Sequence, residues 1–457
     1  MINPALDRAV EALRPQLEET LAAWIRIPSV KGDPQPGAPF GQDVRCMLDR
    51  ALADGKALLG NARDIDGYAG DMEIGEGEDV VGLLAHLDVV PAGDGWQVDP
   101  FGATIKDGRM YGRGASDDKG PAVAALYAMK AVKDAGIKLS RRVRLILGCD
   151  EESGMDDIAY YDRKIGLPAV GFSPDAEFPV INTEKGILQM EARADLRCET
   201  IVSIQSGTRP NVVPGTAVAV VRGAQASDRA LAFASQNGIR LASESLDGDT
   251  FKLTVTGVPA HASTPWQGVN AASQLLLVLE AIGAGGKRIA ALAQAIGRDS
   301  DGSGLGIAGS DQVSGPLTIN LGLLSFDGEK LSATFDCRYP VFFSDAQIAR
   351  FVQMRLSDGG FTVEAGHASQ PHHVPESSFI VRSLLKVYAE LSGHDAHTIA
   401  IGGGTYARCM KQAVAFGPLF PGEEELAHQA GENVDLEQLM LSVRIFAYAI
   451  VELAGQA

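Results

Sequence analysis

The sequence predicts an α/β fold in which a mainly parallel mixed sheet, flanked by helices, is interrupted by an inserted α+β domain. Apolar strand-like runs alternate with helical patterns from about Leu58 to Phe172, as expected for a parallel sheet covered on both faces. From about Gly186 the pattern changes to strands such as LQMEARADL and FKLTVTG with helices between them. A helical pattern from Phe379 to Leu391 then returns to the first type.

The length and composition of the chain support two domains. A chain of 457 residues is too long for one typical core, and its 46% hydrophobic content is ample to bury two. We expect residues 1–184 and 376–457 to form the first domain and residues 185–375 to form the inserted one. Residues late in the chain should therefore belong with those of its first third.

The N-terminal segment is predicted to be one amphipathic helix. The apolar residues that recur there at helical spacing are Leu6, Val10, Leu13, Leu17, Leu21 and Trp24. No basic region followed by an apolar core precedes them, and no stretch approaches the ~18 continuous apolar residues of a membrane span. We therefore expect neither a signal peptide nor a membrane anchor.

Charge and cysteine content limit the partners and the compartment. A formal net charge of -18 without a compensating basic stripe makes nucleic acid or an anionic membrane an unsuitable partner. The five cysteines have an odd count and no CxxC spacing, so neither a thiolate zinc site nor a disulfide framework is indicated. A reducing cytoplasm fits these features best.

His86 and Asp88 lie at the end of a predicted buried strand. The apolar run from Val80 to Ala85 ends at the histidine, and strand ends are where α/β enzymes place their chemistry. A metal-binding histidine needs its second nitrogen anchored, and the carboxylate two residues on could accept that hydrogen bond. By itself, an HxD pattern is more often a solvated strand end.

The segment GRGASDDKGP supplies Asp117 and Asp118 directly before a predicted helix. Its glycines allow a tight backbone path, and Pro121 suits the first helical turn. Apolar residues at helical spacing predict that the helix continues to Gly136. A carboxylate at this place could reach two metals, or it could simply cap the helix.

The predicted strand RRVRLILG is followed by the acidic segment DEES. Glu151 and Glu152 are adjacent, so one could bind a metal while the other faces the attacking water. A dry cleft and nearby carboxylates would raise the pKa of Glu151, as a general base requires, although metals would lower it. Taken alone, DEES is better interpreted as an acidic loop in solvent.

Two further candidates follow similar local signals. Asp175 comes after a short apolar stretch, in a loop that Pro174 and Pro179 stiffen. His428 lies just before a predicted helix, whose buried face comprises Leu436, Leu439, Met440, Val443, Ala447 and Ile450. Either residue taken alone is typical of a structural or solvent-facing position.

Together these residues have the composition of a site for two divalent metals. The candidate ligands are two imidazoles and three carboxylates, from His86, Asp117, Glu152, Asp175 and His428. Glu151 remains as a base that could deprotonate the attacking water, so the set predicts a hydrolase. Oxygen and nitrogen ligands of this kind accept zinc, manganese or cobalt.

In their order and their residues, these segments resemble those of the co-catalytic zinc peptidases, a family that includes carboxypeptidase G, aminoacylase and succinyl-diaminopimelate desuccinylase. Within that family the chain looks most like the dipeptidase V branch, also called Xaa-His dipeptidase or carnosinase-like. The segments that carry the likeness are HLDVVPAGDGW, GRGASDDKGP, DEES, SPDAEFP, EKG, GVPAHASTP and GGGTYAR. The resemblance covers nearly the whole chain and implies a catalytic domain made from both chain ends, with an inserted lid.

The resemblance implies a role for each metal ligand. Asp117 would bridge two divalent ions, with His86 and Asp175 on one ion and Glu152 and His428 on the other. Both ions would most naturally be zinc.

The resemblance also implies the residues that act on the water. Glu151 would be the base that activates it, and Asp88 would orient His86. The peptide bond from Asp117 to Asp118 is expected to be cis, as is usual for the bridging aspartate of the family.

His261 and Asn211 are candidates for contact with the scissile carbonyl. Negative charge grows on that oxygen during water attack, and a positioned imidazole can stabilise it. The resemblance implies this role for His261, in VPAHAS, and implies that Asn211, in RPNVVP, joins it. Without the resemblance, a histidine between two alanines is more often a loop residue.

Arg338 and the run GGGTYAR are candidates for binding the substrate carboxylate. A guanidinium is the natural bidentate donor, and Arg338 matches the carboxylate-binding arginine of the family. The backbone amides of Gly403, Gly404 and Thr405 could cradle an anion. As a pure pattern, three glycines more often mean a flexible turn.

We therefore expect a metal-dependent dipeptidase with two divalent ions per chain, which hydrolyses dipeptides that have a free C-terminal carboxylate. Its partner would be a small peptide substrate over which the inserted domain closes, and the chain would be a monomer or a homodimer. An N-acyl-amino-acid deacylase would use the same chemistry. A non-catalytic metal-binding or peptide-binding protein is the alternative from a different class.

Overall fold

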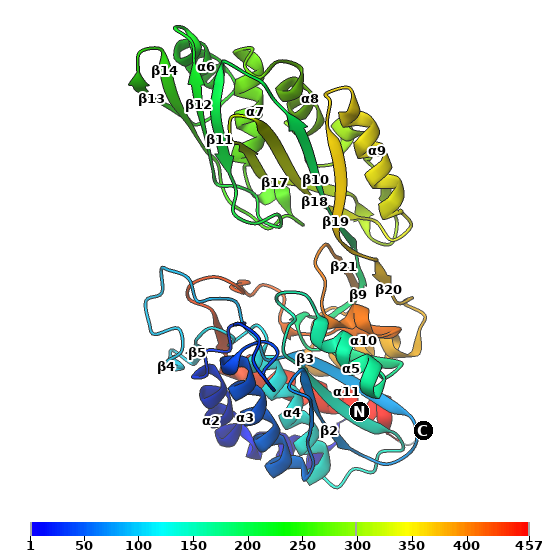
Figure 1. Ribbon diagram of the computed structural model, residues 1–457. Coiled ribbons are helices and arrows are strands. Elements are labelled where there is room, and N and C mark those ends of the chain that lie inside the picture. Colours follow the sequence, from blue (N-terminus) through cyan, green and yellow to red (C-terminus); the bar gives the residue numbers. More distant parts are fainter. Residues whose placement is uncertain (1, 298, 456–457) are drawn as a thin grey trace. The chain divides into compact units, whose positions relative to one another are not determined.

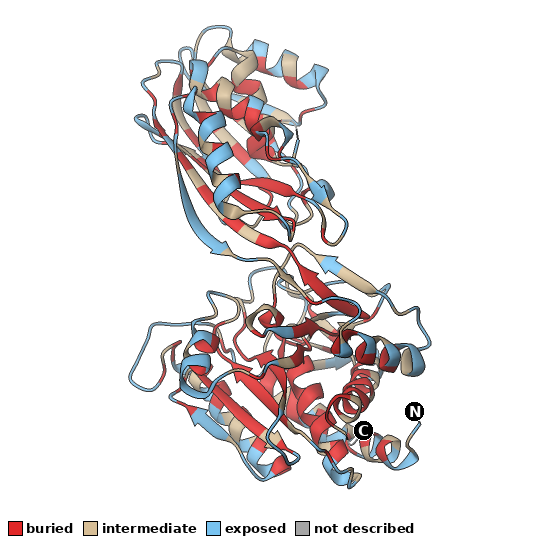
Figure 2. Cartoon of the chain, turned by 90° about the vertical axis from the view of Figure 1, so that its right-hand side faces the viewer, coloured by how far each residue is buried: buried red, intermediate tan, exposed pale blue. Residues whose placement is uncertain are grey.

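The computed structural model describes residues 2–297 and 299–455 and divides into two compact units (Figure 1). The terminal unit contains the described residues of Met1–Asn182, Val374–Ile399 and Gly404–Ala457. The inserted unit contains those of Thr183–His373 and Ala400–Gly403. Each unit has its own hydrophobic core of buried residues (Figure 2).

The first sheet is mixed, with a parallel centre. Within the described residues it has nine strands in the order β1-β2-β6-β3-β7-β22-β9-β20, with β21 also paired to β9. Strands β6, β3, β7 and β22 are parallel neighbours, while β1, β2, β9 and β20 pair in antiparallel fashion. The bounds are β1 Arg63–Ile65, β2 Ala69–Ile74, β3 Val80–His86, β6 Arg142–Gly148, β7 Val170–Ser173, β9 Val180–Glu184, β20 His372–His373, β21 Thr398–Ile401 and β22 Gln412–Ala415. The predicted mixed α/β sheet is confirmed; its parallel pairs lie at the centre and antiparallel pairs lie on both sides of them.

Helices cover this sheet, which explains why its central strands are continuously apolar. From Val81 to His86 every residue of β3 is buried, as is every residue of β6 from Val143 to Gly148. Helix α4 packs on both strands and against α11. The helices of the terminal unit are α1 Pro4–Ala12, α2 Arg14–Ile25, α3 Gln42–Leu59, α4 Lys119–Asp134, α5 Asp156–Ile165, α10 Phe379–Ser392 and α11 Leu436–Ala454.

The N-terminal segment forms two helices where one was predicted. All six apolar residues of the predicted stripe are buried, but the helix breaks at Leu13. Pro15 lies in the first turn of α2 and has no N–H to donate to the preceding turn, so a continuous helix would lose a hydrogen bond there. The prediction of a single helix was therefore wrong.

The inserted unit is an antiparallel sheet with helices packed on it. Its described residues form eight strands in the order β13-β14-β12-β11-β17-β18-β10-β19. Their bounds are β10 Gly186–Asp195, β11 Ile201–Ser206, β12 Thr216–Arg222, β13 Leu241–Asp247, β14 Thr250–Thr256, β17 Thr318–Phe326, β18 Lys330–Tyr339 and β19 Thr362–Ser369. The helices are α6 Ala226–Gln236, α7 Ala271–Ala281, α8 Gly286–Ile296 and α9 Asp345–Ser357. Along β10, buried residues alternate with more exposed ones, as expected where one face meets helices.

Short elements complete the chain. A small sheet joins β24, β5 and β4, and two further strand pairs are β23 with β8 and β15 with β16. The bounds are β4 Thr104–Lys106, β5 Arg109–Tyr111, β8 Ala176–Glu177, β15 Ser310–Asp311, β16 Gly315–Pro316, β23 Pro418–Leu419, β24 Asn433–Asp435, η1 Pro265–Gln267, η2 Ser303–Leu305 and η3 Tyr406–Cys409. None of the helices in the described part of the chain combines the length and the apolar character of a membrane span.

Candidate metal centre

The parallel strands of the terminal unit end beside one another and place polar side chains at one edge. His86 is the last residue of β3, Glu151 follows the end of β6 by three residues, and Asp175 follows the end of β7 by two. Because parallel strands share a direction, their carboxyl ends lie at the same edge of the sheet. Asp118 lies at the N-cap of α4, directly after Asp117.

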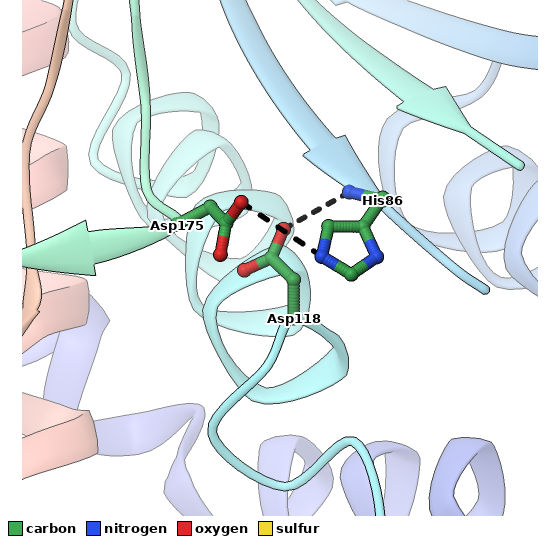
Figure 3. Close-up of side chains that lie close together, drawn as sticks. All are labelled: His86, Asp118 and Asp175. Carbon is green, nitrogen blue, oxygen red and sulfur yellow. Dashed lines mark hydrogen bonds and ion pairs between the residues drawn. The ribbon is translucent and has the colours of Figure 1, made fainter. Parts of the chain in front are cut away.

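One cluster of possible metal ligands is formed by His86, Asp118 and Asp175 (Figure 3). One ligand atom from each residue lies within 4.8 Å of the other two. Asp175 Oδ2 is 3.8 Å from His86 Nε2, and the backbone N–H of His86 donates to Asp118 Oδ2 at 2.9 Å. Figure 3 shows both carboxylates directed at His86.

A second cluster is formed by Asp117, Glu152 and His428. His428 Nε2 lies 2.8 Å from Glu152 Oε1 and 3.0 Å from Asp117 Oδ2. The structure therefore brings the late histidine to two carboxylates that lie about 300 residues earlier in the chain. His428 has a left-handed backbone, with φ of 63°, and half of its side chain is exposed.

Asp117, a member of the second cluster, also contacts His86 of the first cluster. Its Oδ1 is 3.0 Å from His86 Nε2, while its Oδ2 is 3.0 Å from His428 Nε2. A carboxylate that directs one oxygen at each imidazole has the geometry of a ligand shared by two ions. The peptide bond between Asp117 and Asp118 is cis, as the sequence led us to expect.

The donor set fits two divalent ions. Ligand atoms that each lie ~2.0–2.2 Å from a tetrahedral ion are about 3.4 Å apart, and the four imidazole–carboxylate distances span 2.8 to 3.8 Å. In addition, Asp118 Oδ1 is buried and has no hydrogen-bond partner among the described residues. A buried carboxylate oxygen normally has a partner, and a cation would supply one.

The second nitrogen of His86 is anchored mainly by a backbone carbonyl. His86 Nδ1 lies 2.9 Å from the main-chain oxygen of Asp88 and 3.5 Å from its carboxylate. That carboxylate instead accepts from the backbone N–H groups of Glu151, at 3.1 Å, and Glu152, at 3.2 Å. The side-chain contact expected from strand alternation is therefore the longer one, because β3 ends at His86 and Asp88 lies outside the strand.

Glu151 lies next to the clusters but belongs to neither. Burial raises the pKa of its carboxyl, the His86 ring lowers it, and the carboxylates of Glu152, Asp117 and Asp88 raise it further, with a large net rise. This direction matches what a general base needs in the absence of metals.

The two imidazoles are held in charged surroundings. Burial lowers the pKa of His428, but hydrogen bonds to Asp117 and Glu152 raise it to about 10. His86 is fully buried, and hydrogen bonds to Asp117 and Asp88 outweigh that burial and raise its pKa well above the usual value. Both shifts favour the imidazolium form of the rings in the metal-free protein, where each ring lies between carboxylates that would otherwise repel one another.

Two structural partners of the centre were not found by sequence reasoning. Asp157, at the start of α5, accepts from the backbone N–H groups of Cys149 and Asp150 and from the hydroxyl of Tyr406. These contacts hold the turn that carries Glu151. The only local signal was an acidic pair at a helix start, which is typical of a cap.

Asn211 and His261 lie side by side in the inserted unit. A β-bridge joins Val212 to His261, and the backbone N–H of Ala262 donates to the Asn211 carbonyl at 2.9 Å. His261 Nδ1 accepts from the backbone N–H of Ser263 at 3.3 Å. In the neutral ring, Nε2 is then the nitrogen that carries the proton and can donate.

Arg338 is buried within the inserted unit and already holds a carboxylate. Its Nε and Nη2 donate to Asp336 at 2.5 and 3.2 Å, and its Nη1 donates to the Gly402 carbonyl at 2.8 Å. A guanidinium has five N–H groups, so these contacts leave hydrogens on Nη1 and Nη2. Asp336 was not predicted as a partner of Arg338, although residues two apart on a strand share a face.

The glycine run lacks the left-handed residues of one common type of anion nest. A nest alternates right-handed and left-handed residues, but Gly403 and Gly404 have no left-handed φ. A Cβ at Gly404 would come within 2.4 Å of the Arg408 guanidinium, so a larger residue there would require that flexible side chain to move. The Thr405 hydroxyl accepts from the backbone N–H of Ala407 and caps η3.

Two imidazole–carboxylate clusters lie at the ends of the parallel strands of this mixed sheet, and Asp117 contacts the imidazole of each. This arrangement is typical of a dinuclear metal centre. The chain belongs to Peptidase family M20/M25/M40, whose model matches residues 82–452. The family resemblance stated from the sequence is thereby confirmed.

The similarity extends over nearly the whole chain. The chain is 39% identical over 452 residues to the putative dipeptidase YtjP of Bacillus subtilis (strain 168), which covers 94% of this chain and 96% of that one. The fold of this chain is similar to that of human carnosine dipeptidase 1, with a TM-score of 0.59 and 16% identity; the match covers 98% of this chain and 99% of that one. The dipeptidase Dug1p of Saccharomyces cerevisiae has a TM-score of 0.59 at 14% identity, with 98% of each chain covered.

Proposed function

We propose that this chain is a metal-dependent dipeptidase that hydrolyses dipeptides with a free C-terminal carboxylate. One observation carries the proposal: Asp117 directs its two oxygens at two imidazoles, while Glu151 lies beside them outside both clusters. A site that only binds metal has no use for such an extra carboxylate. The 39% identity to a putative dipeptidase over nearly the full length of both chains supports the choice of substrate class.

The proposed ligands divide between two ions. His86 and Asp175 would hold one ion, Glu152 and His428 the other, and Asp117 would be shared. When bound, such ions supply Lewis acidity, which lowers the pKa of water and polarises the scissile carbonyl. We propose zinc as the metal, and metal analysis of the purified protein tests this choice against manganese and cobalt.

The proposed chemistry of the side chains follows from their donors and acceptors. Glu151 accepts a proton from the attacking water and delivers it to the nitrogen of the leaving amine. His261, joined by Asn211, donates a hydrogen bond to the carbonyl oxygen as negative charge grows there. Arg338 uses its remaining N–H groups to hold the C-terminal carboxylate of the substrate.

The adjacent glutamates provide a matched test of this proposal. Glu151→Gln should retain both metals and lose ~10²–10⁴-fold in turnover, because only the proton acceptor is removed. Glu152→Gln makes the same chemical change one residue later and should lose metal content as well as turnover. Near-wild-type turnover in Glu151→Gln, with both metals bound, would refute the proposed base.

A substrate panel distinguishes a dipeptidase from a deacylase with the same metals. Dipeptides and N-acetyl amino acids with the same C-terminal residue should be compared at equal concentration. We expect the dipeptides to be cleaved faster. Preferential cleavage of the N-acetyl amino acids would instead establish an N-acyl-amino-acid deacylase, and tight binding of dipeptides without cleavage would indicate a binding protein.

The cytoplasm is the proposed compartment. The basis is the odd, scattered set of five cysteines, which is not the pattern of a disulfide-stabilised secreted protein. Fractionation of the source cells would test this assignment.

A further inference from the structure

A buried ion pair contacts the backbone of the shared aspartate. Arg113 and Glu432 have 1% and 0% of their surfaces exposed, and Arg113 Nη1 donates to Glu432 Oε2. The other oxygen, Oε1, accepts from the backbone N–H of Ser116 at 3.0 Å and from its hydroxyl at 3.2 Å. It also accepts from the backbone N–H of Asp117 at 3.2 Å.

Glu432 lies where the two segments that carry metal-ligand candidates meet. It directly precedes β24, which pairs with β5, and its carbonyl accepts from the backbone N–H of Gly112 at 3.0 Å. The chain runs from β5 through Arg113 to Asp117, and His428 comes four residues before Glu432. A single carboxylate therefore connects the turn that carries Asp117 with the segment that carries His428.

Arg113 allows this carboxylate to be buried as an ion. Its Nη2 donates to the Ala92 carbonyl at 3.2 Å, and its guanidinium lies over the Trp96 ring, 5.5 Å from the ring centre. Burying an ionised carboxylate without such a partner would be strongly unfavourable. As an ion, the Glu432 carboxylate is a stronger acceptor, because hydrogen bonds to an ionised group are roughly twice as strong as neutral ones.

We propose that Glu432, paired with Arg113, is a positioning residue that orients Asp117 so that its two oxygens reach both imidazoles, and that this pair thereby sets the affinity for the metals. The inference rests on the proposed metal-binding function. Two backbone hydrogen bonds, from the N–H groups of Ser116 and Asp117, fix the turn, and the direction of the Asp117 side chain follows from that backbone. Loss of comparable supporting contacts typically lowers metal affinity ~10–100-fold.

The test compares Glu432 with a buried carboxylate elsewhere in the terminal unit. Asp71 is also fully buried, accepts from Arg63 at 2.7 and 2.6 Å and from the Tyr161 hydroxyl at 2.5 Å, and contacts none of the proposed ligands. Zinc affinity of the full-length wild type, Glu432→Ala and Asp71→Ala would be measured by competition with a chelator, on protein shown to be folded by circular dichroism.

The expected result is a ~10–100-fold weaker zinc affinity for Glu432→Ala and wild-type affinity for Asp71→Ala. Glu432→Gln keeps an acceptor oxygen without its charge, so a smaller loss of about threefold to tenfold is expected. If Glu432→Ala does not fold, Glu432→Gln decides the question by itself. Wild-type affinity in a folded Glu432 variant, or an equal loss in Asp71→Ala, would overturn the inference, whereas a wild type that binds no metal would instead refute the proposed function.

Discussion

Metal binding to this protein should release protons, because the surroundings of the two proposed ligand histidines favour their charged form in the metal-free state. His428 Nε2 lies 2.8 Å from one carboxylate and 3.0 Å from another, and these contacts raise its pKa to about 10. His86 is fully buried against Asp117, and its pKa is also raised. A metal binds only the unprotonated imidazole, so each ring must lose its proton first.

The number of protons released depends on the charge of the two imidazole rings. Half of the His428 side chain is exposed, so solvent screens its carboxylate neighbours. Even half of the rise from 6.5 to about 10 leaves the imidazolium as the main form at pH 7. Together with His86, at least about two protons should leave when both ions bind, and the raised pKa values of Asp175 and Glu152 can only add to that number. Apparent affinity should then increase about tenfold per pH unit for each proton displaced.

Isothermal titration calorimetry provides the assay. Zinc would be titrated into metal-free protein at pH 7 in two buffers with different ionisation enthalpies, and the difference in measured heat gives the number of protons released. A matched titration of Glu151→Gln, which leaves every proposed ligand in place, should also release protons from both histidines. Binding of two ions with fewer than one proton released would refute the charge assignment of the imidazoles.

Three other predictions concern one residue of the inserted unit and two of the terminal unit. Arg338→Lys cannot reproduce the bidentate contacts to Asp336, so KM for dipeptides should rise about tenfold or more while kcat changes little. Steady-state kinetics that show the reverse would contradict the proposed role of Arg338 in holding the substrate carboxylate. Burial raises the pKa of Asp157 to about 7, so the folded state holds this proton more tightly than the unfolded state, and stability should fall by about 2 kcal/mol from pH 5 to pH 7. In urea unfolding, the stability of Asp157→Asn should not show this loss of about 2 kcal/mol between pH 5 and pH 7. A variant with the pH dependence of the wild type would count against the raised pKa of Asp157. Leu83→Ala, in the fully buried centre of β3, should lower the free energy of unfolding by ~2–5 kcal/mol, and a loss below ~1 kcal/mol in urea titration would show that the core tolerates the cavity.

Much of the site was predictable because its residues follow local signals. The run from Val80 to Ala85 predicted the strand that ends at His86, and the glycines before Asp117 predicted the turn at the start of α4. Such patterns depend on neighbours within a few residues, which the sequence displays directly. The pairing of Asp336 with Arg338 was also within reach, because alternate residues of a strand share a face.

The contacts that were missed join segments far apart in the chain. The Asp88 carboxylate binds backbone N–H groups about 60 residues away, and Glu432 contacts Arg113 and Asp117 more than 300 residues away. A buried acceptor takes whichever donor packing brings to it, and no local pattern specifies that donor. The break between α1 and α2 differs from these long-range contacts, because Pro15 is a local signal that could have predicted it from the sequence.

By itself, the amino-acid sequence determined the strands, the helices and the set of imidazoles and carboxylates that a metal pair would need, because periodicity and residue chemistry are local properties. Only the tertiary structure decided that Asp117 turns one oxygen to His86 and the other to His428. It also decided that Glu432 lies against the backbone of that same turn. Side-chain direction depends on how the parallel strands and the last helix pack, and packing is a property of the whole folded unit.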